Sequence, residues 1–438
     1  MHLTTFSLSR AAAFAVALLP VLSAHAAEPT HLTYRTGKQY DYSQYPWHQS
    51  MELLWKTNWD PLSRIGVYPF DQWGNHSDFE SIMGTLMERY PGQSANDFDD
   101  DKWAEPFLEP GQHVLKMAQE YENEGLTDLA SKTYLRAATV FRIGYFPWYG
   151  LMSHSHLKAK AWRLEKKAYE AGMRLGRYAF ESVSIPFKDA PSGSFSKNVP
   201  VYITGPKRTP ASSKVVLMIA GLDHYRSGQL TEVADLCDQG FTVINVDMPG
   251  TGDAPITGKK PEDDAKLWRS IMDWIHAEAG RRRWSKDDVY AWGTSTGSYW
   301  SVKISRSERR RLKGVLTQGT ASHYTFQPDW LESSDKLGYP VALWNALAGA
   351  FGYDDKLEFA EQSKRYSLRD QGVLDAKSAP VTVVNGMDDT VFPIDDSVLL
   401  ATHGDGATLR LFPGQGHMGQ PASGEFIAAF WKQVAKSG

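Results

Sequence analysis

A serine between two glycines is the residue best suited to covalent chemistry in this 438-residue chain. Gly293, Ser295 and Gly297 form a Gly-x-Ser-x-Gly pentapeptide that follows the β-type run 288–292 and precedes the helix-compatible run 298–304. A nucleophilic serine needs a strained strand-to-helix turn, because only small neighbours let the backbone turn sharply while the hydroxyl projects above the sheet. The pentapeptide alone is a weak signal. Its position between a strand and a helix predicts a nucleophile elbow at Ser295.

An acid and a histidine follow this serine, each at the end of a later strand-like run. The apolar run 381–384 opens into a loop that contains Asp389, and the run 409–412 opens into the glycine-flanked loop of His417. The chain order serine, aspartate, histidine is that of the α/β-hydrolases and differs from the other two common serine-hydrolase orders. The adjacent Asp388 is the alternative acid, but the spacing from the preceding glycine and to the following Val and Pro favours Asp389.

These three side chains would act together in acyl transfer. Ser295 must lose its proton as it attacks a carbonyl, and a neutral imidazole on His417 can accept that proton. Asp389 would fix the tautomer of the ring and stabilise the imidazolium that forms. The order and the placement at strand ends therefore favour catalysis over an ordinary surface histidine.

The oxyanion that develops in such a reaction needs fixed N–H donors. One is expected to be the amide of Thr296, directly after the nucleophile, and the other the amide of Leu222, in the turn after a buried strand. Two further histidines, His224 and His323, precede the acid and lie off the final loop. We expect structural or substrate-contacting roles for them.

The first residues have the pattern of a secretory signal peptide. Arg10 precedes an apolar run from Ala11 to Leu22, and Ala24 and Ala26 form a small-x-small cleavage signal. The run is short for a membrane span and polar sequence follows it, so an uncleaved anchor is the less favoured alternative. Removal of residues 1–26 would leave no membrane anchor and a periplasmic or secreted protein.

The composition argues against several classes of partner and site. The chain has 47 basic and 51 acidic residues, a balance that does not fit a nucleic-acid or polyanion partner. The arginine runs 281–283 and 309–311 are typical of solvated helix ends. Cys237 is the only cysteine, so an exported chain must fold without an internal disulfide, which suits a bacterial periplasmic or secreted enzyme. Its surroundings favour a small core residue over a nucleophile.

The pattern of predicted secondary structure changes near residue 179. After cleavage about 410 residues would remain, which suggests two domains, a helical one at 27–178 and a catalytic one at 179–438. The first is rich in Trp and Tyr and has helical runs, whereas the second alternates strand-like runs with helix-sized segments. This alternation predicts a doubly wound, mostly parallel sheet. A longer insertion at 326–369 is expected to help cover the site. Helices are expected at 111–124, 126–141 and 156–175, and strands at 181–187, 199–204, 215–219, 241–246, 289–292, 314–316, 381–384 and 408–412.

Several motifs in one order resemble the FrsA-type α/β-hydrolases, a group with 2,6-dihydroxypseudooxynicotine hydrolase and the fungal pigment hydrolases that shorten polyketide chains. The resemblance implies an α/β-hydrolase fold with an N-terminal helical cap domain, and it places the family's catalytic residues on Ser295, Asp389 and His417. Residues 30–105 have no counterpart in it, and the signal peptide departs from relatives that are mainly intracellular. The resemblance starts near residue 126 and rests on the segments SKTYLRAATVFRIGYFPW, KAKAWRLEKKAYEAG, FESVSIPF, IAGLDHYRS, DMPGTGDAP, GTSTG, NGMDDTVFP and GQGHMG.

A cap over the site would contribute aromatic side chains to substrate binding. Such a pocket is expected to be mostly apolar and to favour substrates with an aromatic or bulky acyl portion. Phe146, Trp148 and Trp162 are the candidates, although Trp and Phe at helical spacing are more often core residues.

We therefore expect an exported serine hydrolase that cleaves an ester-like small molecule through an acyl-enzyme, without a metal or organic cofactor. The first alternative is hydrolysis of a carbon–carbon bond in a β-diketone or polyketide-like substrate, which the same triad can support, and a peptidase is the next. A catalytically dead binding protein on the same scaffold is the alternative from another class, and the intact triad argues against it. The sequence does not determine the acyl group, the leaving group or the oligomeric state.

Overall fold

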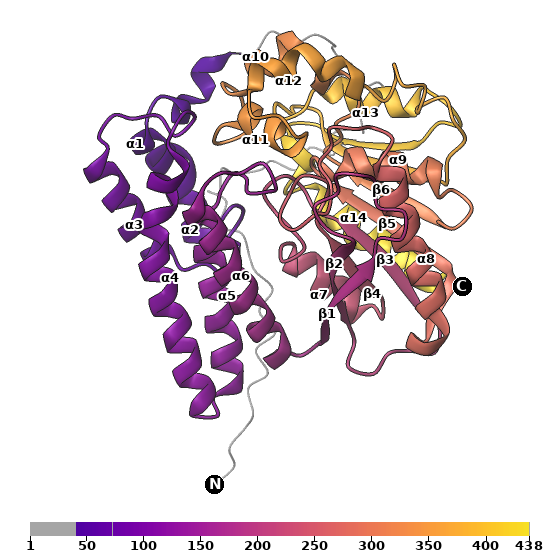
Figure 1. The fold of residues 1–438 in the computed structure, drawn as a ribbon, viewed down its shortest axis with the longest axis horizontal. Helices are drawn as coiled ribbons and strands as arrows, with labels where there is room; N and C mark the ends of the chain where they lie inside the picture. The colour runs from indigo at the N-terminus through magenta and orange to yellow at the C-terminus, as the bar shows by residue number, and fades with distance from the viewer. Residues whose placement is uncertain (1–40, 72, 438) are drawn as a thin grey trace, which may run out of the picture. The chain divides into compact units, whose positions relative to one another are not determined.

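The computed structural model describes residues 41–71 and 73–437. The expected signal peptide lies outside these residues. Within them, a helical N-terminal part is followed by a single eight-stranded sheet with helices on both faces (Figure 1). None of the described helices combines the length and the hydropathy that a membrane span requires.

The N-terminal part is helical throughout, as the sequence predicts. A short helix α1 continues through a π-helical turn, Trp55–Trp59, into α2, and three long helices α4, α5 and α6 follow α3. Side chains begin several of these helices: the Asp99 carboxylate accepts from the Lys102 amide at 2.8 Å, and the Ser155 hydroxyl accepts from the Lys158 amide at 2.9 Å. The bounds are α1 Met51–Leu54, α2 Asp60–Ile65, α3 His76–Arg89, α4 Asp100–Asn123, α5 Thr127–Gly144 and α6 His156–Leu175.

The start of α4 differs from the sequence expectation, which begins this helix only at Gly111. Pro106 and Pro110 both lie inside the helix, where proline normally costs stability because it removes a backbone donor and crowds the preceding turn. Burial of Trp103 and Phe107, together with the Asp99 cap, offsets that cost.

The long helices α4, α5 and α6 run side by side in Figure 1. They approach closely because small residues lie at their contacts. A side chain on Gly172 of α6 would come within 2.9 Å of the Leu135 side chain of α5, and one on Gly111 of α4 within 2.4 Å of the Phe141 ring. Larger residues at either glycine would push the helices apart.

The sheet has the strand order β1-β2-β4-β3-β5-β6-β7-β8. The pairs β1–β2 and β2–β4 are antiparallel, and all other pairs are parallel. Each expected strand is present, with modest shifts at the ends. The largest shift is in β5, which begins at Trp284 because that residue pairs with Ser213, before an irregularity in the register between Ser213 and Val215. The bounds are β1 Ala179–Pro186, β2 Asn198–Gly205, β3 Ser213–Ile219, β4 Thr242–Val246, β5 Trp284–Thr294, β6 Gly314–Gln318, β7 Val381–Gly386 and β8 Thr408–Phe412.

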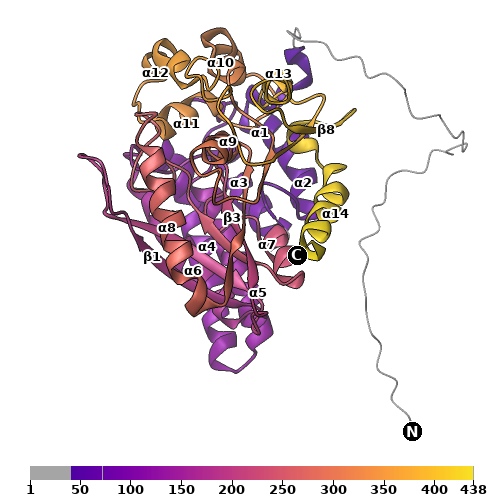
Figure 2. The same cartoon turned by 90° about the vertical axis from the view of Figure 1, so that its right-hand side faces the viewer.

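Alternate residues of the central strands fill two different cores. In β3, Val215, Leu217 and Ile219 pack in the cluster that contains α8 and α9, whereas Val216 and Met218 pack with α7 and α14. Figure 2 shows α8 and α14 on opposite sides of β3. Both faces of the parallel strands are therefore buried, as the continuous apolar runs predict. The helices of this part are α7 Leu230–Asp238, α8 Asp264–Arg282, α9 Gly297–Ser307, α13 Ile394–Ala401 and α14 Ser423–Lys436.

The insertion between β6 and β7 folds into three short helices, α10 Pro328–Ser334, α11 Leu343–Ala350 and α12 Lys356–Gln362. Its aromatic residues pack mainly among themselves and against α9: the Phe351 ring stacks on Trp300 at 6.0 Å and lies 4.5 Å from the Tyr366 ring. Figure 1 shows these helices beyond the carboxyl ends of the parallel strands. Ligands of doubly wound proteins bind at that edge of the sheet.

Candidate active site

Ser295 lies in the sharp turn between β5 and α9. Its φ is +50°, in the left-handed region that a residue with a side chain rarely adopts, and its amide donates to the Gln318 carbonyl of β6 at 2.8 Å. The flanking glycines are sterically required. A Cβ on Gly293 would lie 2.5 Å from the Gly297 carbonyl oxygen, and one on Gly297 would lie 2.4 Å from that of Ala220. The local geometry is that of a nucleophile elbow.

Asp389 is buried in the loop after β7, with four hydrogen-bond donors around its carboxylate. The amides of Val391 and Phe392 donate to Oδ1 at 2.8 and 3.1 Å, and the Asn385 side chain donates to Oδ2 at 2.9 Å. His417 provides the fourth contact. The neighbouring Asp388 is exposed. Burial and the contact with His417 therefore distinguish Asp389 from the alternative acid.

His417 connects the acid to the serine. Its Nδ1 lies 2.9 Å from Asp389 Oδ2, and its Nε2 lies 2.9 Å from Ser295 Oγ. The Phe392 ring packs edge-on against the imidazole, with ring centroids 5.3 Å apart. The structure thus brings together three residues that lie far apart in the sequence.

The backbone after the histidine is fixed by a residue that the sequence reasoning missed. The Asn385 side-chain oxygen accepts from the Met418 amide at 3.0 Å, while its side-chain nitrogen donates to Asp389. One amide group at the end of β7 therefore orients both the acid and the loop of the base. Its signal in the sequence is only a polar residue that ends an otherwise apolar strand.

The two expected oxyanion donors belong to the segments that meet at Ser295. Leu222 and Thr296 are both buried, and a Cβ on the adjacent Gly221 would lie 3.1 Å from the Ser295 Cβ. In the described part of the chain, neither of the two amides donates a hydrogen bond to a protein acceptor. Unpaired buried N–H groups are rare, so these two donors are available to a ligand oxygen.

The rival histidines have other partners. His224 packs edge-on against the Tyr68 ring at 5.4 Å, and its Nε2 lies 3.5 Å from an Asp71 carboxylate oxygen. His323 Nδ1 lies 2.6 Å from the Ser367 hydroxyl. Both sets of contacts fit the structural roles expected for these residues.

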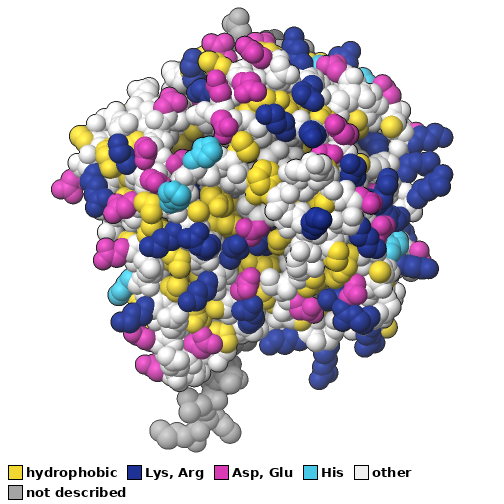
Figure 3. Space-filling view, in the orientation of Figure 1, with side chains coloured by type: hydrophobic (Ala, Val, Ile, Leu, Met, Phe, Trp, Pro, Cys, Tyr) yellow, Lys and Arg dark blue, Asp and Glu magenta, His cyan; other side chains and the backbone are white. Residues whose placement is uncertain are grey.

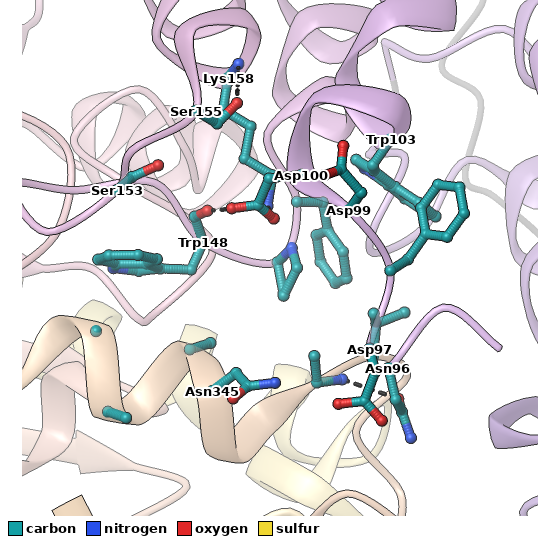
Figure 4. Close-up of a pocket in the computed structure, with 18 of the residues that line it drawn as sticks. Asn96, Asp97, Asp99, Asp100, Trp103, Trp148, Ser153, Ser155, Lys158 and Asn345 are labelled. Atoms are coloured by element: carbon teal, nitrogen blue, oxygen red, sulfur yellow. Dashed lines mark hydrogen bonds and ion pairs between the residues drawn. The ribbon is translucent and has the colours of Figure 1, made fainter. Parts of the chain in front are cut away.

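A cavity of about 580 Å³ lies between the N-terminal part and α11 (Figure 4). Phe146 and Trp148 line it, but none of the three residues Ser295, Asp389 and His417 does. The sequence predicts a mostly apolar pocket, but the lining of this cavity is mixed. Polar side chains from the beginning of α4, from the connection to α6 and from the insertion also face the space. They include Asn96, Asp97, Asp99, Asp100, Lys158 and Asn345.

Trp162, the third aromatic candidate, does not line this cavity. It is 1% exposed, and its indole nitrogen donates to the Asp253 carboxylate at 2.8 Å. Its ring packs edge-on against Tyr145 and Tyr225 at 5.7 and 5.2 Å. Trp162 therefore joins α6 to the loop after β4 as a packed residue, which is the more common role of a buried tryptophan.

Glu165 is a buried acid of α6 that contacts the segment between β3 and α7. The hydroxyls of Tyr145 and Ser227 donate to its two carboxylate oxygens at 2.9 and 2.7 Å. Burial raises the pKa of this carboxyl from 4.5 to about 7, although both hydroxyl groups favour the charged form. Between these two pKa values, the folded protein binds a proton that the unfolded chain has released.

This difference predicts a pH-dependent stability. Glu165 contributes stability that is fully present below pH 4.5 and is lost as the pH rises through about 7. The free energy of unfolding of the parent should fall by up to about 3 kcal/mol relative to Glu165→Gln between pH 4.5 and 8. Urea unfolding of both proteins across this range measures the difference, with Glu124→Gln at the exposed end of α4 as the control. If the free energy of unfolding changed with pH in the same way for the parent and Glu165→Gln, the raised pKa of Glu165 would be contradicted.

Charged side chains of both signs are distributed over the part of the surface that Figure 3 shows. In the described residues, no three His, Cys, Asp or Glu side chains are grouped so that they could hold a metal ion.

Comparison with known proteins finds a curated relative with similar sequence. The chain is 25% identical over 297 residues to Esterase FrsA of Photorhabdus laumondii subsp. laumondii, and the match covers 65% of this chain and 65% of that relative's length. The chain resembles the FrsA-type α/β-hydrolases. The resemblance expected from the sequence motifs is therefore confirmed, and no family model matches the chain.

Solved structures confirm the fold of the chain. The crystal structure of 2,6-dihydroxy-pseudo-oxynicotine hydrolase superposes with a TM-score of 0.65 at 17% identity, covering 87% of this chain and 96% of that one. AbyA5 superposes with a TM-score of 0.59 at 21% identity, covering 82% of this chain and 89% of that one. The expected α/β-hydrolase fold with an N-terminal helical part is the fold observed.

Proposed function

We propose that this protein is a serine hydrolase that cleaves an ester-like substrate through an acyl-enzyme. The observation that carries the proposal is the continuous contact from Asp389 through His417 to the Ser295 hydroxyl, with 2.9 Å at each step. The similarity of this chain to a relative named an esterase supports an ester-like substrate.

In the first half of the reaction, Ser295 Oγ bonds to the substrate carbonyl carbon while its proton moves to His417 Nε2. The buried Asp389 carboxylate holds the Nδ1 proton and stabilises the imidazolium. The carbonyl oxygen becomes an oxyanion, to which the amides of Leu222 and Thr296 donate. His417 then protonates the leaving oxygen, and the carbon–oxygen bond breaks to give the acyl-enzyme.

In the second half, a water molecule replaces the alcohol. His417 Nε2 accepts its proton, the hydroxide oxygen bonds to the acyl carbon, and the proton returns to Ser295 Oγ as the acid leaves. Every proton step uses the same imidazole, so no cofactor is required by this scheme.

A panel of chromogenic esters and β-diketones tests the reaction class. The purified parent should hydrolyse at least one ester series, and Ser295→Ala should hydrolyse none. Turnover of β-diketones without turnover of esters would instead support the carbon–carbon alternative. A parent that binds members of the panel without any turnover would support the binding-protein alternative.

We further propose that the cavity beside Phe146 and Trp148 receives the larger portion of the substrate. Its volume suits a small organic ligand. Its wall also reaches the oxyanion turn: the Phe146 ring stacks on Tyr339 at 6.0 Å, and the Tyr339 hydroxyl donates to Asp223, next to Leu222, at 2.7 Å.

This placement predicts a specificity change in Trp148→Ala. The parent should have a higher kcat/KM for aryl esters than for acetyl esters. The ratio of these two values should fall roughly tenfold in the variant, because a large aromatic side chain is removed from the cavity wall. Trp274→Ala, on α8 against Trp284, is the control for loss of a tryptophan outside the cavity. A folded Trp148→Ala protein with the parent's ratio would exclude Trp148 from substrate binding, and a parent that prefers acetyl esters would exclude the bulky-substrate proposal.

Export is part of the proposal and is supported only by the sequence pattern of residues 1–26. Cleavage after Ala26 would be measured as the intact mass of the protein recovered from the periplasm or medium. A full-length mass in the cytosolic fraction would contradict it.

A further inference from the structure

The side chain that follows the Leu222 oxyanion donor is held by two tyrosines from different parts of the fold. Asp223 is 7% exposed, and one of its carboxylate oxygens accepts from both the Tyr68 and the Tyr339 hydroxyl groups, the latter at 2.7 Å. Tyr68 lies in the loop after α2, and Tyr339 lies in the insertion between α10 and α11. Two distant segments therefore converge on the residue adjacent to the donor.

The same turn has further anchors in the N-terminal part. The Tyr225 hydroxyl donates to the Tyr149 carbonyl at 2.7 Å, and the Ser227 hydroxyl donates to Glu165 at 2.7 Å. With Asp223, every second residue from 223 to 227 is bonded to the helical part. This regular attachment indicates that the helical part determines the conformation of the turn.

Both ends of the turn contact the nucleophile elbow. At its beginning, Gly221 lies against Ser295, as described above. At its end, the Gln229 side chain donates to the Thr294 hydroxyl at 2.9 Å, one residue before the nucleophile. A displacement of the turn would therefore change the distance between the Leu222 amide and the reacting oxygen.

The segment of Tyr339 also contacts the loop of the acid. A Cβ on Gly338 would lie 2.4 Å from the Thr390 hydroxyl, so the backbone of this glycine approaches the residue directly after Asp389. The Phe146 ring stacks on the ring of Tyr339 itself. Tyr339 is thus packed between the oxyanion turn, the acid loop and the cavity wall.

From these contacts we infer that Tyr68 and Tyr339 are positioning residues that hold the Leu222 amide at the oxyanion through Asp223. The assignment rests on the proposed serine chemistry. Burial, followed by the negative charge of Asp223, raises the pKa of both phenols well above 10. Both hydroxyls therefore stay protonated, and remain donors, over the working range of the enzyme.

The clamp formed by Tyr68, Asp223 and Tyr339 should affect the transition state more than the bound substrate. A donor stabilises an oxyanion only when it lies within about 2.7–3.1 Å of the position of that oxygen, and loss of one donor lowers kcat by roughly 10²- to 10³-fold. The uncharged substrate carbonyl depends much less on this distance. The expected signature is a fall in kcat with little change in KM.

The test uses conservative tyrosine variants of the full chain. Tyr68→Phe and Tyr339→Phe should each lower kcat by roughly tenfold, and the double variant by roughly 100-fold, with KM within about threefold of the parent. Inhibition by an aryl boronic acid, which forms a tetrahedral adduct on the serine, should weaken in parallel with kcat/KM. Asp223→Asn, which keeps an acceptor oxygen, should retain more activity than Asp223→Leu.

Tyr134→Phe is the matched control, because it removes a comparable tyrosine–carboxylate hydrogen bond, to Glu122, within the helical part. It should leave kcat and boronic acid inhibition unchanged. If the double variant keeps the parent's kcat, or loses activity through KM alone, the positioning role is wrong. A parent that turns over no substrate and binds no boronic acid would contradict the proposed function and this assignment together.

Discussion

Ser295→Ala is expected to lower kcat by roughly 10⁵- to 10⁶-fold while the protein remains folded. The hydroxyl is the only group in the proposed path that forms a bond to the substrate, and the oxyanion donors alone leave only a small residual rate. The methyl side chain fits without new contacts, so thermal unfolding should change little. The measurement is kcat on the best ester of the panel.

Ser81→Ala, an exposed serine of α3, is the control for a serine without a catalytic role. It should retain the parent's activity. If Ser295→Ala retained activity within an order of magnitude of the parent, the assignment of the nucleophile would be wrong.

Asp389→Asn is expected to lower kcat by roughly 10⁴-fold, less than loss of the nucleophile. The reason is the donor-rich environment of the carboxylate. An amide at this position would direct its NH₂ group either at the Val391 and Phe392 amides or at the Asn385 amide and the imidazole. In the second orientation the imidazole would lose the acceptor that fixes its tautomer, and in the first the NH₂ group would face two backbone donors and disturb the loop that holds it.

Asp388→Asn is the matched control for this result, since it makes the same chemical change one residue earlier on an exposed side chain. Its kcat should stay within about twofold of the parent, as is usual for surface substitutions. The reverse order of the two variants would transfer the role of the acid to Asp388.

The parts of the fold and site that follow from local sequence rules could be predicted. The elbow follows from Gly293 and Gly297, whose missing side chains are required by direct backbone contacts. The positions of Asp389 and His417 follow from buried parallel strands that end at one edge of the sheet. Apolar β-branched runs define such strands well, because both faces are covered.

Long-range features could not be predicted in the same way. Tyr68 and Asp223 are far apart in the sequence, and the region around Tyr68 has no periodic pattern that would indicate its partner. The polar lining of the cavity is also formed by residues far apart in the sequence, since they come from the beginning of α4, the connection before α6 and the insertion. Trp162 shows the limit of composition, since residue type alone does not separate a packed tryptophan, the more common case, from one that faces a ligand.

The proposed serine chemistry is tested most directly by labelling with a fluorophosphonate and mapping the adduct by peptide mass spectrometry. We expect a single adduct on Ser295 in the parent, none in Ser295→Ala, and strongly slowed labelling in His417→Ala, because the hydroxyl loses its general base. An adduct on a different residue, or a parent that remains unlabelled while it hydrolyses esters, would contradict the account.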